Sequence, residues 1–353
     1  MNVAYKTALA VGCDGALFTD GINRRYVSGF PSTEGAALCY EGGVALFLDM
    51  RYAASAENAH LKDEVRVIRC KDGILKEVKA FIAAKGIKRL IIESTAVTVA
   101  MLESYQKTLT ETELVPHKNI CGSARQIKTA AEIECIRKAQ AITDKCFAHI
   151  LGFIRRGMTE KEVAAEMEYY MKKQGADGLA FDTIAVYGLK SALPHGVPGN
   201  EVLGEGGFFT MDFGASYGGY CSDMTRTVVI GKASDEMKKI YETVLEAQKA
   251  GIAAIKDGVS CKSVDAVARK IIEDNGYGEY FTHSLGHSLG LEIHESPACS
   301  PNSADTLRAG TFMTVEPGIY IEGLGGVRIE DMVLVTENGC ENFTASPKEL
   351  IEL

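Results

Sequence analysis

The sequence lacks the features that would attach it to a membrane or to nucleic acid. No apolar stretch approaches the roughly 18 residues that a bilayer-spanning helix needs. Lysine and arginine form no block, and the formal net charge is −9, which argues against nucleic acid and anionic membranes as partners. The apolar patch TALAVGC near the start has only Lys6 before it and Asp14 close behind, so it makes a poor signal peptide.

The cysteines lack any paired spacing. All 10 are scattered singly, without a C-x-x-C pair. In a chain of 353 residues this pattern is typical of reduced thiols and not of a disulfide framework. Together with the absences above, it predicts a cytoplasmic protein.

Two common catalytic motifs are also absent. His294 and Glu295 begin like the helix of a zinc peptidase, but position 298 holds alanine in place of the second histidine, and Pro297 would break the helix. The glycine-rich segments GGYCSDM and GLGGVRIE lack the strand, G-x-G-x-x-G and helix arrangement of a dinucleotide site. Neither a zincin helix nor nucleotide binding is therefore expected.

Length and patterning indicate two domains. Up to about residue 122, β-type runs such as GVALFLDM (43–50) and RLIIEST (89–95) alternate with helical stretches such as ILKEVKAFIAAKG (74–86), which is typical of a small α/β domain. A boundary is expected at 121–123.

Helices dominate the start of the second domain. Apolar residues from Ile133 to Ile150 follow one helical face, and Thr159 with Glu162 forms a capping box that opens another helix. Helices expected around 234–256 and 261–275 would frame the strands of this domain.

Two aspartates stand where a hairpin is expected. The apolar run 208–213 contains Asp212, three glycines supply a turn, and 220–230 returns as a second strand that contains Asp223. An acid buried in a strand is costly unless it is paired or bound to a cation. Taken alone, such a pair would more often be exposed turn residues, so its meaning depends on what accompanies it.

Further candidate ligands gather towards the C-terminus. The segment FTHSLGHSLGLEIHESP holds His283, His287 and His294, three of only 7 histidines in the chain. Glu316 ends a β-type run before a Pro-Gly pair, and Glu330 interrupts an apolar strand. A single such residue would usually be a satisfied core histidine or a solvated acid, and their conjunction is what favours a site.

Five of these side chains make a candidate metal site: Asp212, Asp223, His287, Glu316 and Glu330. Four carboxylates and one imidazole form a hard, oxygen-rich donor set, which suits two Mn²⁺-like ions held close together better than one structural zinc. Such a pair of ions is a device for hydrolysis. Cys221 would share a strand face with the second aspartate, but a thiolate favours softer metals, so it is not counted as a ligand.

These segments resemble the metallopeptidases of the pita-bread fold, which include methionine aminopeptidase, aminopeptidase P and prolidase. The matching segments are ALPHG (192–196), MDFGASYGGYCSDMTRT (211–227), HSLGHSLGLEIHE (283–295), TVEPGIY (314–320) and VRIED (327–331). Nearer the start, RRYVSGFPSTEG and LDMRY resemble the N-terminal domain of the aminopeptidase P branch. The resemblance implies an α/β N-terminal (creatinase-like) domain over 1–122. An α+β pita-bread catalytic domain would follow over 123–353, with a curved antiparallel sheet flanked by helices.

The resemblance also implies a role for each metal ligand. Asp212 would bind one metal, and Asp223 and Glu330 would bridge both. His287 and Glu316 would complete the other metal, and Glu316 would also shuttle the proton of the attacking water towards the departing nitrogen.

Other matching positions surround the ligands. His195 and His294 correspond to histidines that contact substrate and stabilise the tetrahedral intermediate. His283 and Arg328 correspond to positions on the side where proline binds, and Tyr320 to an aromatic residue near it. One residue departs from the family pattern, because Ser288 stands where many relatives have glycine. We expect its side chain to narrow the pocket or to donate a hydrogen bond.

The resemblance implies a peptidase that acts on proline-containing peptides with two divalent ions, Mn²⁺ or else Co²⁺. An Xaa-Pro aminopeptidase is the leading interpretation, since the chain carries the N-terminal domain of that branch, and an Xaa-Pro dipeptidase (prolidase) is the alternative. A relative that binds peptide or protein without catalysis, or that hydrolyses creatine without metal, is the third. A homodimer is also expected, because the family is often dimeric.

Overall fold

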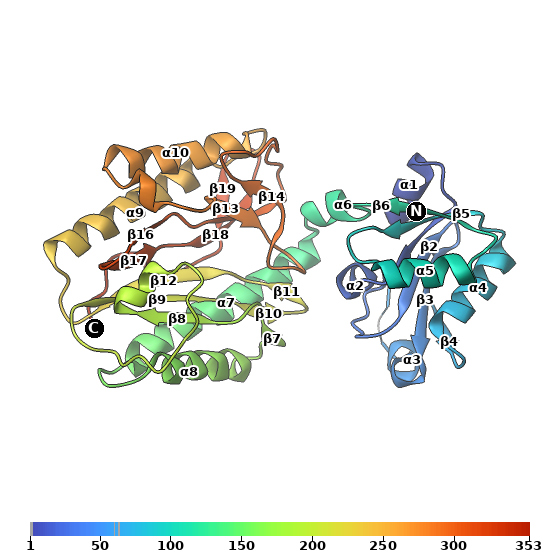
Figure 1. Ribbon diagram of the computed structural model, residues 1–353, viewed down its shortest axis with the longest axis horizontal. Coiled ribbons are helices and arrows are strands. Elements are labelled where there is room, and N and C mark those ends of the chain that lie inside the picture. The colour runs from blue at the N-terminus through green and yellow to red at the C-terminus, as the bar shows by residue number, and fades with distance from the viewer. Residues whose placement is uncertain (1–2, 60, 63) are drawn as a thin grey trace. The chain divides into compact units, whose positions relative to one another are not determined.

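The computed structural model describes residues 3–59, 61–62 and 64–353. It separates into two compact units, Met1–Ala124 and Arg125–Leu353 (Figure 1). Among the described helices, none combines the length and the apolar character needed to cross a membrane.

The first unit is built on one mixed six-stranded sheet with the order β4-β3-β2-β1-β5-β6. Its strands are β1 (Gly15–Phe18), β2 (Ala36–Tyr40), β3 (Gly43–Asp49), β4 (Val65–Cys70), β5 (Arg89–Glu93) and β6 (Glu113–His117). The helices are α1 (Val3–Ala10), α2 (Gly21–Ser28), α3 (Met50–Glu57), α4 (Ile74–Lys85) and α5 (Val99–Thr108). β2 runs antiparallel to β1 and β3, while the β3–β4, β1–β5 and β5–β6 pairs are parallel.

Strand β3, next to the edge strand β4, is buried on both faces of this sheet. Leu46 and Leu48 pack into a cluster with residues of α1, α2 and α3, whereas Phe47 packs with Val78 of α4 and Tyr105 of α5. Helices on both faces explain why residues 43–48 are continuously apolar and do not alternate.

The second unit contains only antiparallel strand pairs between its named strands. After α6 (Gly122–Gln126), its helices are α7 (Ala130–Phe153), α8 (Glu160–Lys173), η1 (Gly188–Ala192), α9 (Asp235–Ala253), α10 (Cys261–Asp274) and η2 (Gly278–Tyr280). The first strands are β7 (Gly178–Leu179), β8 (Ile184–Tyr187), β9 (Gly207–Phe213), β10 (Ala215–Tyr217), β11 (Tyr220–Cys221) and β12 (Met224–Ile230). The later strands are β13 (Gly286–Ser288), β14 (Glu295–Cys299), β15 (Phe312–Val315), β16 (Gly318–Ile321), β17 (Gly325–Arg328), β18 (Asp331–Val335) and β19 (Cys340–Asn342).

Two helix pairs cover the strands of this unit. α7 and α8 share a core with β8, β9 and β12, and α9 and α10 share another with β15, β16, β17 and β18. Figure 1 shows the strands between these two pairs. The predicted helices around 234–256 and 261–275 are confirmed as α9 and α10, and the capping box of Thr159 and Glu162 opens α8 as expected.

The predicted acidic hairpin is wrong in one respect, because residues 220–230 do not form a single strand. β11 turns back onto β10 through Gly218 and Gly219, whose φ angles are 59° and 81°, while β12 pairs separately with β9. The strand breaks where the chain passes Gly214, at which a Cβ atom would lie only 1.9 Å from the carbonyl oxygen of Ser222. Asp223 therefore lies at a break between strands and not within one.

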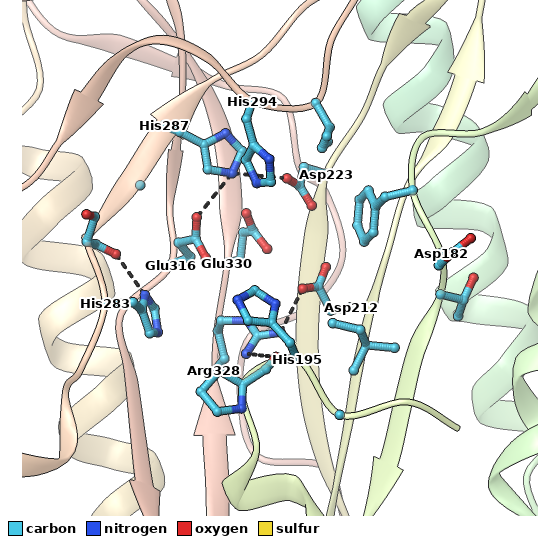
Figure 2. Close-up of a pocket in the computed structure, with 18 of the residues that line it drawn as sticks. Asp182, His195, Asp212, Asp223, His283, His287, His294, Glu316, Arg328 and Glu330 are labelled. Carbon is cyan, nitrogen blue, oxygen red and sulfur yellow. Dashed lines mark hydrogen bonds and ion pairs between the residues drawn. The ribbon is translucent and has the colours of Figure 1, made fainter. Parts of the chain in front are cut away.

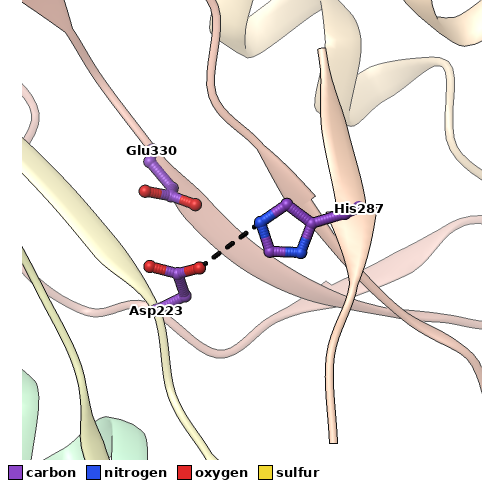
Figure 3. Close-up of side chains that lie close together, drawn as sticks. All are labelled: Asp223, His287 and Glu330. Carbon is purple, nitrogen blue, oxygen red and sulfur yellow. Dashed lines mark ion pairs between the residues drawn. The ribbon is translucent and has the colours of Figure 1, made fainter. Parts of the chain in front are cut away.

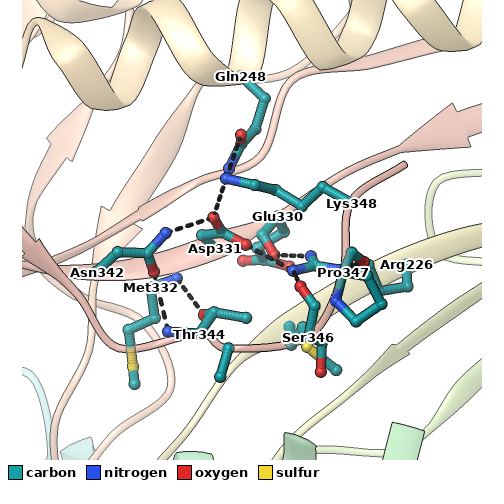
Figure 4. A network of polar contacts seen from close by, with 12 residues as sticks. Arg226, Gln248, Glu330, Asp331, Met332, Asn342, Thr344, Ser346, Pro347 and Lys348 are labelled. Atoms are coloured by element: carbon teal, nitrogen blue, oxygen red, sulfur yellow. Dashed lines mark hydrogen bonds and ion pairs between the residues drawn. The ribbon is translucent and has the colours of Figure 1, made fainter. Parts of the chain in front are cut away.

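A buried ion pair ties β12 to β18, which belong to two different sheets (Figure 4). Arg226 donates four hydrogen bonds to backbone carbonyls, including that of Glu330, and one to Oδ1 of Asp331 at 2.7 Å. Oδ2 of Asp331 accepts from Lys348 at 2.6 Å and from Asn342 at 2.7 Å. Although burial raises the pKa of Asp331, the charges of Arg226 and Lys348 outweigh it and lower that pKa below its usual value.

Asp331→Asn should lower the free energy of unfolding of the second unit by about 3–5 kcal/mol, because it leaves the Arg226 guanidinium buried without its counter-charge. Denaturant unfolding followed by circular dichroism measures this change. Lys232→Ala is the matched control, since it breaks an ion pair whose lysine is 85% exposed, and it should change stability little. Equal effects of the two substitutions would contradict the role given to the buried pair.

Candidate metal centre

The five predicted metal ligands come from five different places in the second unit and line one cavity of about 560 Å³. Asp212 lies on β9 and His287 on β13, whereas the other three lie just beyond strand ends: Asp223 before β12, Glu316 after β15 and Glu330 before β18. Figure 2 shows their side chains turned towards one another. Strand ends allow this convergence, because a residue there is free of the strict alternation of a paired strand.

Three of the donors lie close enough to share a single cation. The ligand atoms of Asp223, His287 and Glu330 all lie within 4.8 Å of one another (Figure 3). Nε2 of His287 is 3.6 Å from Oδ2 of Asp223 and 3.3 Å from Oε1 of Glu316. Nδ1 of the same imidazole is 3.1 Å from the carbonyl oxygen of Ser288, so Nδ1–H donates to that carbonyl and Nε2 is left as the ligand atom.

Asp212 is held at the edge of the cluster by an arginine. Nη2 of Arg328 donates to Oδ2 of Asp212 at 2.7 Å, and both side chains are nearly buried. Nε and Nη1 of the same guanidinium donate to the hydroxyls of Thr225 and Tyr320 at 3.0 and 2.8 Å. One guanidinium therefore faces four carboxylates, so the cluster carries a large excess of negative charge.

The pKa values of these side chains reflect the excess of negative charge. Burial, followed by the charges of neighbouring carboxylates, raises the pKa of Asp223 well above its usual value, and the same causes act on Glu330. Burial also raises the pKa of Glu316 to about 7, while it lowers the pKa of His287. Acids that crowd in this way retain protons near neutral pH unless a cation lies among them.

Two buried carboxylate oxygens in the cluster have no hydrogen-bond partner among the described residues. They are Oδ1 of Asp212 and Oε1 of Glu330. A buried acceptor without a donor is expensive, and in a set of four carboxylates and one imidazole the natural occupant is a divalent cation. The donor set therefore fits the predicted pair of ions.

Two threonines that the sequence analysis did not single out orient the ligands. Oγ1 of Thr225 donates to Oε2 of Glu330 at 2.7 Å, and Oγ1 of Thr314 donates to Oε1 of Glu316 at 3.0 Å. Thr225 lies two residues after Asp223, and Thr314 two residues before Glu316. Side chains two apart on a strand share a face, so this spacing could have identified both.

The predicted histidines also reach the cavity. His195, His283 and His294 line it together with Arg328. His195 is exposed on the loop after η1, and the ring of His294 meets that of His287 edge to face with centroids 4.4 Å apart. Burial, followed by the charge of the arginine, lowers the pKa of His283 to about 4, so its ring is neutral at neutral pH.

Tyr320 lies behind the wall of the cavity and is not among its lining residues. Its hydroxyl is 2.9 Å from Nε2 of His283 and accepts from Arg328. Since Nδ1 of His283 faces the carbonyl of Ser284 at 2.8 Å, Nδ1 carries the proton and Nε2 accepts from the tyrosine. Tyr320 therefore orients the histidine and the arginine from behind.

Comparison with known proteins agrees with this geometry. Residues 134–337 match Metallopeptidase family M24, and residues 5–127 match the Creatinase/Prolidase N-terminal domain. The chain belongs to metallopeptidase family M24. The expected resemblance and the pita-bread fold class are thereby confirmed, and the protein is a metallopeptidase of a family that uses a dinuclear divalent metal centre.

Several M24 relatives cover nearly the whole chain. An Xaa-Pro dipeptidase of Pyrococcus furiosus is 41% identical, with 94% of this chain and 93% of the relative covered. A solved Xaa-Pro dipeptidase from Bacillus anthracis is 42% identical with a TM-score of 0.96, covering 99% of this chain and 98% of that one. A solved X-Pro aminopeptidase from Thermotoga maritima is 38% identical with a TM-score of 0.92, covering 99% and 100%.

Ser288, the departure from the M24 pattern, does not act as expected. It is fully buried, is not among the residues that line the cavity, and its hydroxyl has no partner among the described residues. Both expectations, a narrowed pocket and a donated hydrogen bond, are therefore wrong. The cause is the alternation of side chains along β13: His287 faces the cavity, so the next side chain, Ser288, lies on the opposite face of the strand and is buried there.

Ser288→Ala should raise the free energy of unfolding by about 1 kcal/mol, because it removes a buried hydroxyl that forms no hydrogen bond. Relative rates on different peptides should not change. Ser222→Ala is the matched control: that hydroxyl lies 2.8 Å from Oγ1 of Thr143 and donates to the carbonyl of Ala215, so its loss should destabilise the unit. A changed peptide preference in Ser288→Ala would show that the serine does shape the pocket.

Proposed function

We propose that this chain is an Xaa-Pro dipeptidase, which hydrolyses the bond between a residue and a C-terminal proline. The observation that carries the hydrolytic part is the convergence of five metal donors, two of them with unpartnered oxygens, in one cavity. The names of relatives that span nearly the whole chain support the dipeptidase. They favour it over the aminopeptidase that the sequence analysis placed first, although one solved neighbour is named X-Pro aminopeptidase.

The five donors would hold two cations. We infer that Asp212 would bind one ion, that His287 and Glu316 would bind the other, and that Asp223 and Glu330 would contribute to both. Two divalent ions bound there would lower the pKa of a shared water and polarise the scissile carbonyl. Mn²⁺ is proposed, with Co²⁺ as the alternative, because oxygen donors dominate the set.

The protein side chains supply proton transfer and charge stabilisation. Glu316 lines the cavity, with Oε1 3.3 Å from Nε2 of His287, and would move a proton from the attacking water to the departing nitrogen. His195 and His294 line the cavity and can present N–H groups to the oxyanion of the tetrahedral intermediate. These roles follow the assignments made from the sequence.

The cavity has the size and lining for a short peptide. A volume of about 560 Å³ lies within the usual range for sites of small ligands. Apolar side chains of Phe181, Ile184 and Ile293 line it together with the polar groups. We place the proline ring on the side of His283 and Arg328, with Tyr320 supporting both from behind.

A relative that only binds peptide is the less favoured alternative. All five donors are present and converge on one cavity, and the crowding of their charges serves no purpose in a binding module, where it only costs free energy. Homodimerisation and a cytoplasmic location remain predictions from the sequence, as do the absence of nucleic acid and of membrane among the partners.

With Mn²⁺ supplied, Xaa-Pro dipeptides should be cleaved at least about tenfold faster than Xaa-Pro-Yaa tripeptides, and matched Xaa-Ala dipeptides more slowly than either. The preference over Xaa-Ala follows from the proline amide, which has no N–H and a fixed ring that a dedicated pocket recognises. The preference over tripeptides follows from the proposed dipeptidase assignment. Values of kcat/KM for the three series measure this preference.

Each other outcome of this panel has a definite meaning. Faster cleavage of tripeptides would return the assignment to Xaa-Pro aminopeptidase. A preference for Met-Ala-Yaa over every proline peptide would overturn both. His195→Ala, which should lower kcat while keeping the bound metal, checks that the measured activity belongs to this site.

A further inference from the structure

A buried ion-pair cluster lies next to the cavity and takes no part in the chemistry described so far. Oε1 of Glu295 is 2.5 Å from Nη2 of Arg125, and Oε2 is 3.1 Å from Nζ of Lys128. The side chains of Glu295 and Lys128 are 5% and 1% exposed. Glu292, which is half exposed, also contacts the arginine.

The cluster holds the loop between two histidines of the site. Oε1 of Glu295 accepts from the backbone N–H of Glu292 at 3.3 Å, and within the same loop the carbonyl of Gly290 accepts from the N–H of Cys221 at 2.8 Å. Glu295 also opens β14, where it pairs with Ser288 next to the bulge of β13. The carboxylate of Glu295 thus ties the start of β14, directly after His294, to Arg125 and Lys128 in the segment before α7.

His294 depends on this anchoring because its ring has little other support. Within the described part of the chain its ring nitrogens make no hydrogen bond, and its ring contact is with His287. His294 lines the cavity, whereas the next side chain, Glu295, is directed at Arg125 and Lys128. Fixing one of two consecutive side chains fixes the backbone from which the other departs.

Stability alone does not explain a cluster of this kind. A buried ion pair seldom stabilises a protein more than apolar residues of similar volume would. Its best-supported use is to specify a single arrangement of the segments that it joins. Although burial raises the pKa of Glu295, the charges of Lys128 and Arg125 outweigh it and lower that pKa. The carboxylate is therefore charged and held at fixed positions.

We propose that Glu295 is a positioning residue, which through Arg125 and Lys128 holds the ring of His294 in place for catalysis. The proposal rests on the proposed function, in which His294 acts on the substrate. It also explains the His294-Glu295 pair that begins like a zincin motif: the glutamate is directed into a salt bridge and not at a metal.

The test is a double-mutant cycle between Glu295→Gln and His294→Ala, with Mn²⁺ saturating and the peptide that the wild type cleaves best. A 1 Å displacement of a catalytic group can cost about 100-fold, so Glu295→Gln should lower kcat by about 10- to 100-fold with bound metal unchanged. In the His294→Ala background the same change should cost less than about threefold. An equal loss in both backgrounds would overturn the proposal.

A second pair of variants separates positioning from folding. Lys128→Met combined with Glu295→Met replaces the ion pair by apolar side chains and should fold at least as well as Glu295→Gln, yet it should show the same loss of kcat. Glu292→Gln, which leaves the Glu295 contacts intact, should keep kcat within about twofold. Wild-type activity in the folded double variant would overturn the proposal.

A readout without activity covers the case in which the proposed substrate is wrong. In protein labelled with ¹³C-histidine, the ring signal of His294 is identified by its loss in His294→Ala. Glu295→Gln should shift or broaden that signal and leave those of His117 and His149 unchanged, because neither histidine lines the cavity. An unchanged His294 signal would contradict the positioning role whatever the substrate proves to be.

Discussion

The mutual repulsion of four carboxylates in one cavity is the constraint on which the rest of the catalytic unit depends. Asp212, Asp223, Glu316 and Glu330 converge there, and Arg328 forms an ion pair with only the first of them. No chain gains stability by collecting like charges out of water. We interpret the surroundings of the cavity as a frame that holds these acids together until cations bind. The frame consists of strand ends, threonine hydroxyls and buried arginines.

The sign of the pKa shift separates the acids of this frame from the acids of the site. Asp331 and Glu295 are as buried as the site acids, yet the pKa of each is lowered because ammonium and guanidinium groups surround it. The pKa values of Asp223 and Glu330 are raised, because burial and other carboxylates act on them without a matching positive charge. In the second unit, Asp331 and Glu295, with lowered pKa values, hold elements of the fold together, whereas the raised values of Asp223 and Glu330 coincide with the functional site.

Much of the site could be predicted because the types of its residues indicate its chemistry. Aspartate and glutamate inside apolar strands are conspicuous, and period-two spacing would have added Thr225 and Thr314. The break before Asp223 could not be predicted, since it lies where the chain passes so close to Gly214 that a Cβ atom there would be 1.9 Å from the carbonyl oxygen of Ser222, and one sequence does not show this close approach. The place of Tyr320 behind the wall of the cavity depends in the same way on packing that one sequence does not express. The burial of Ser288 could have been predicted, because neighbouring side chains on a strand face opposite sides and His287 faces the cavity. The choice between dipeptidase and aminopeptidase depends on cavity shape and came from relatives.

The central claim is that divalent cations replace protons in this cluster. Calorimetric titration of chelator-treated protein with Mn²⁺, in buffers of different ionisation enthalpy, counts both the ions bound and the protons released. Because Glu316 has a pKa of about 7 and those of Asp223 and Glu330 are also raised, the acids hold more protons at pH 6 than at pH 8. The account predicts two ions per chain, with more protons released and weaker apparent binding at the lower pH. Uptake of a single ion, or binding without proton release at either pH, would contradict it.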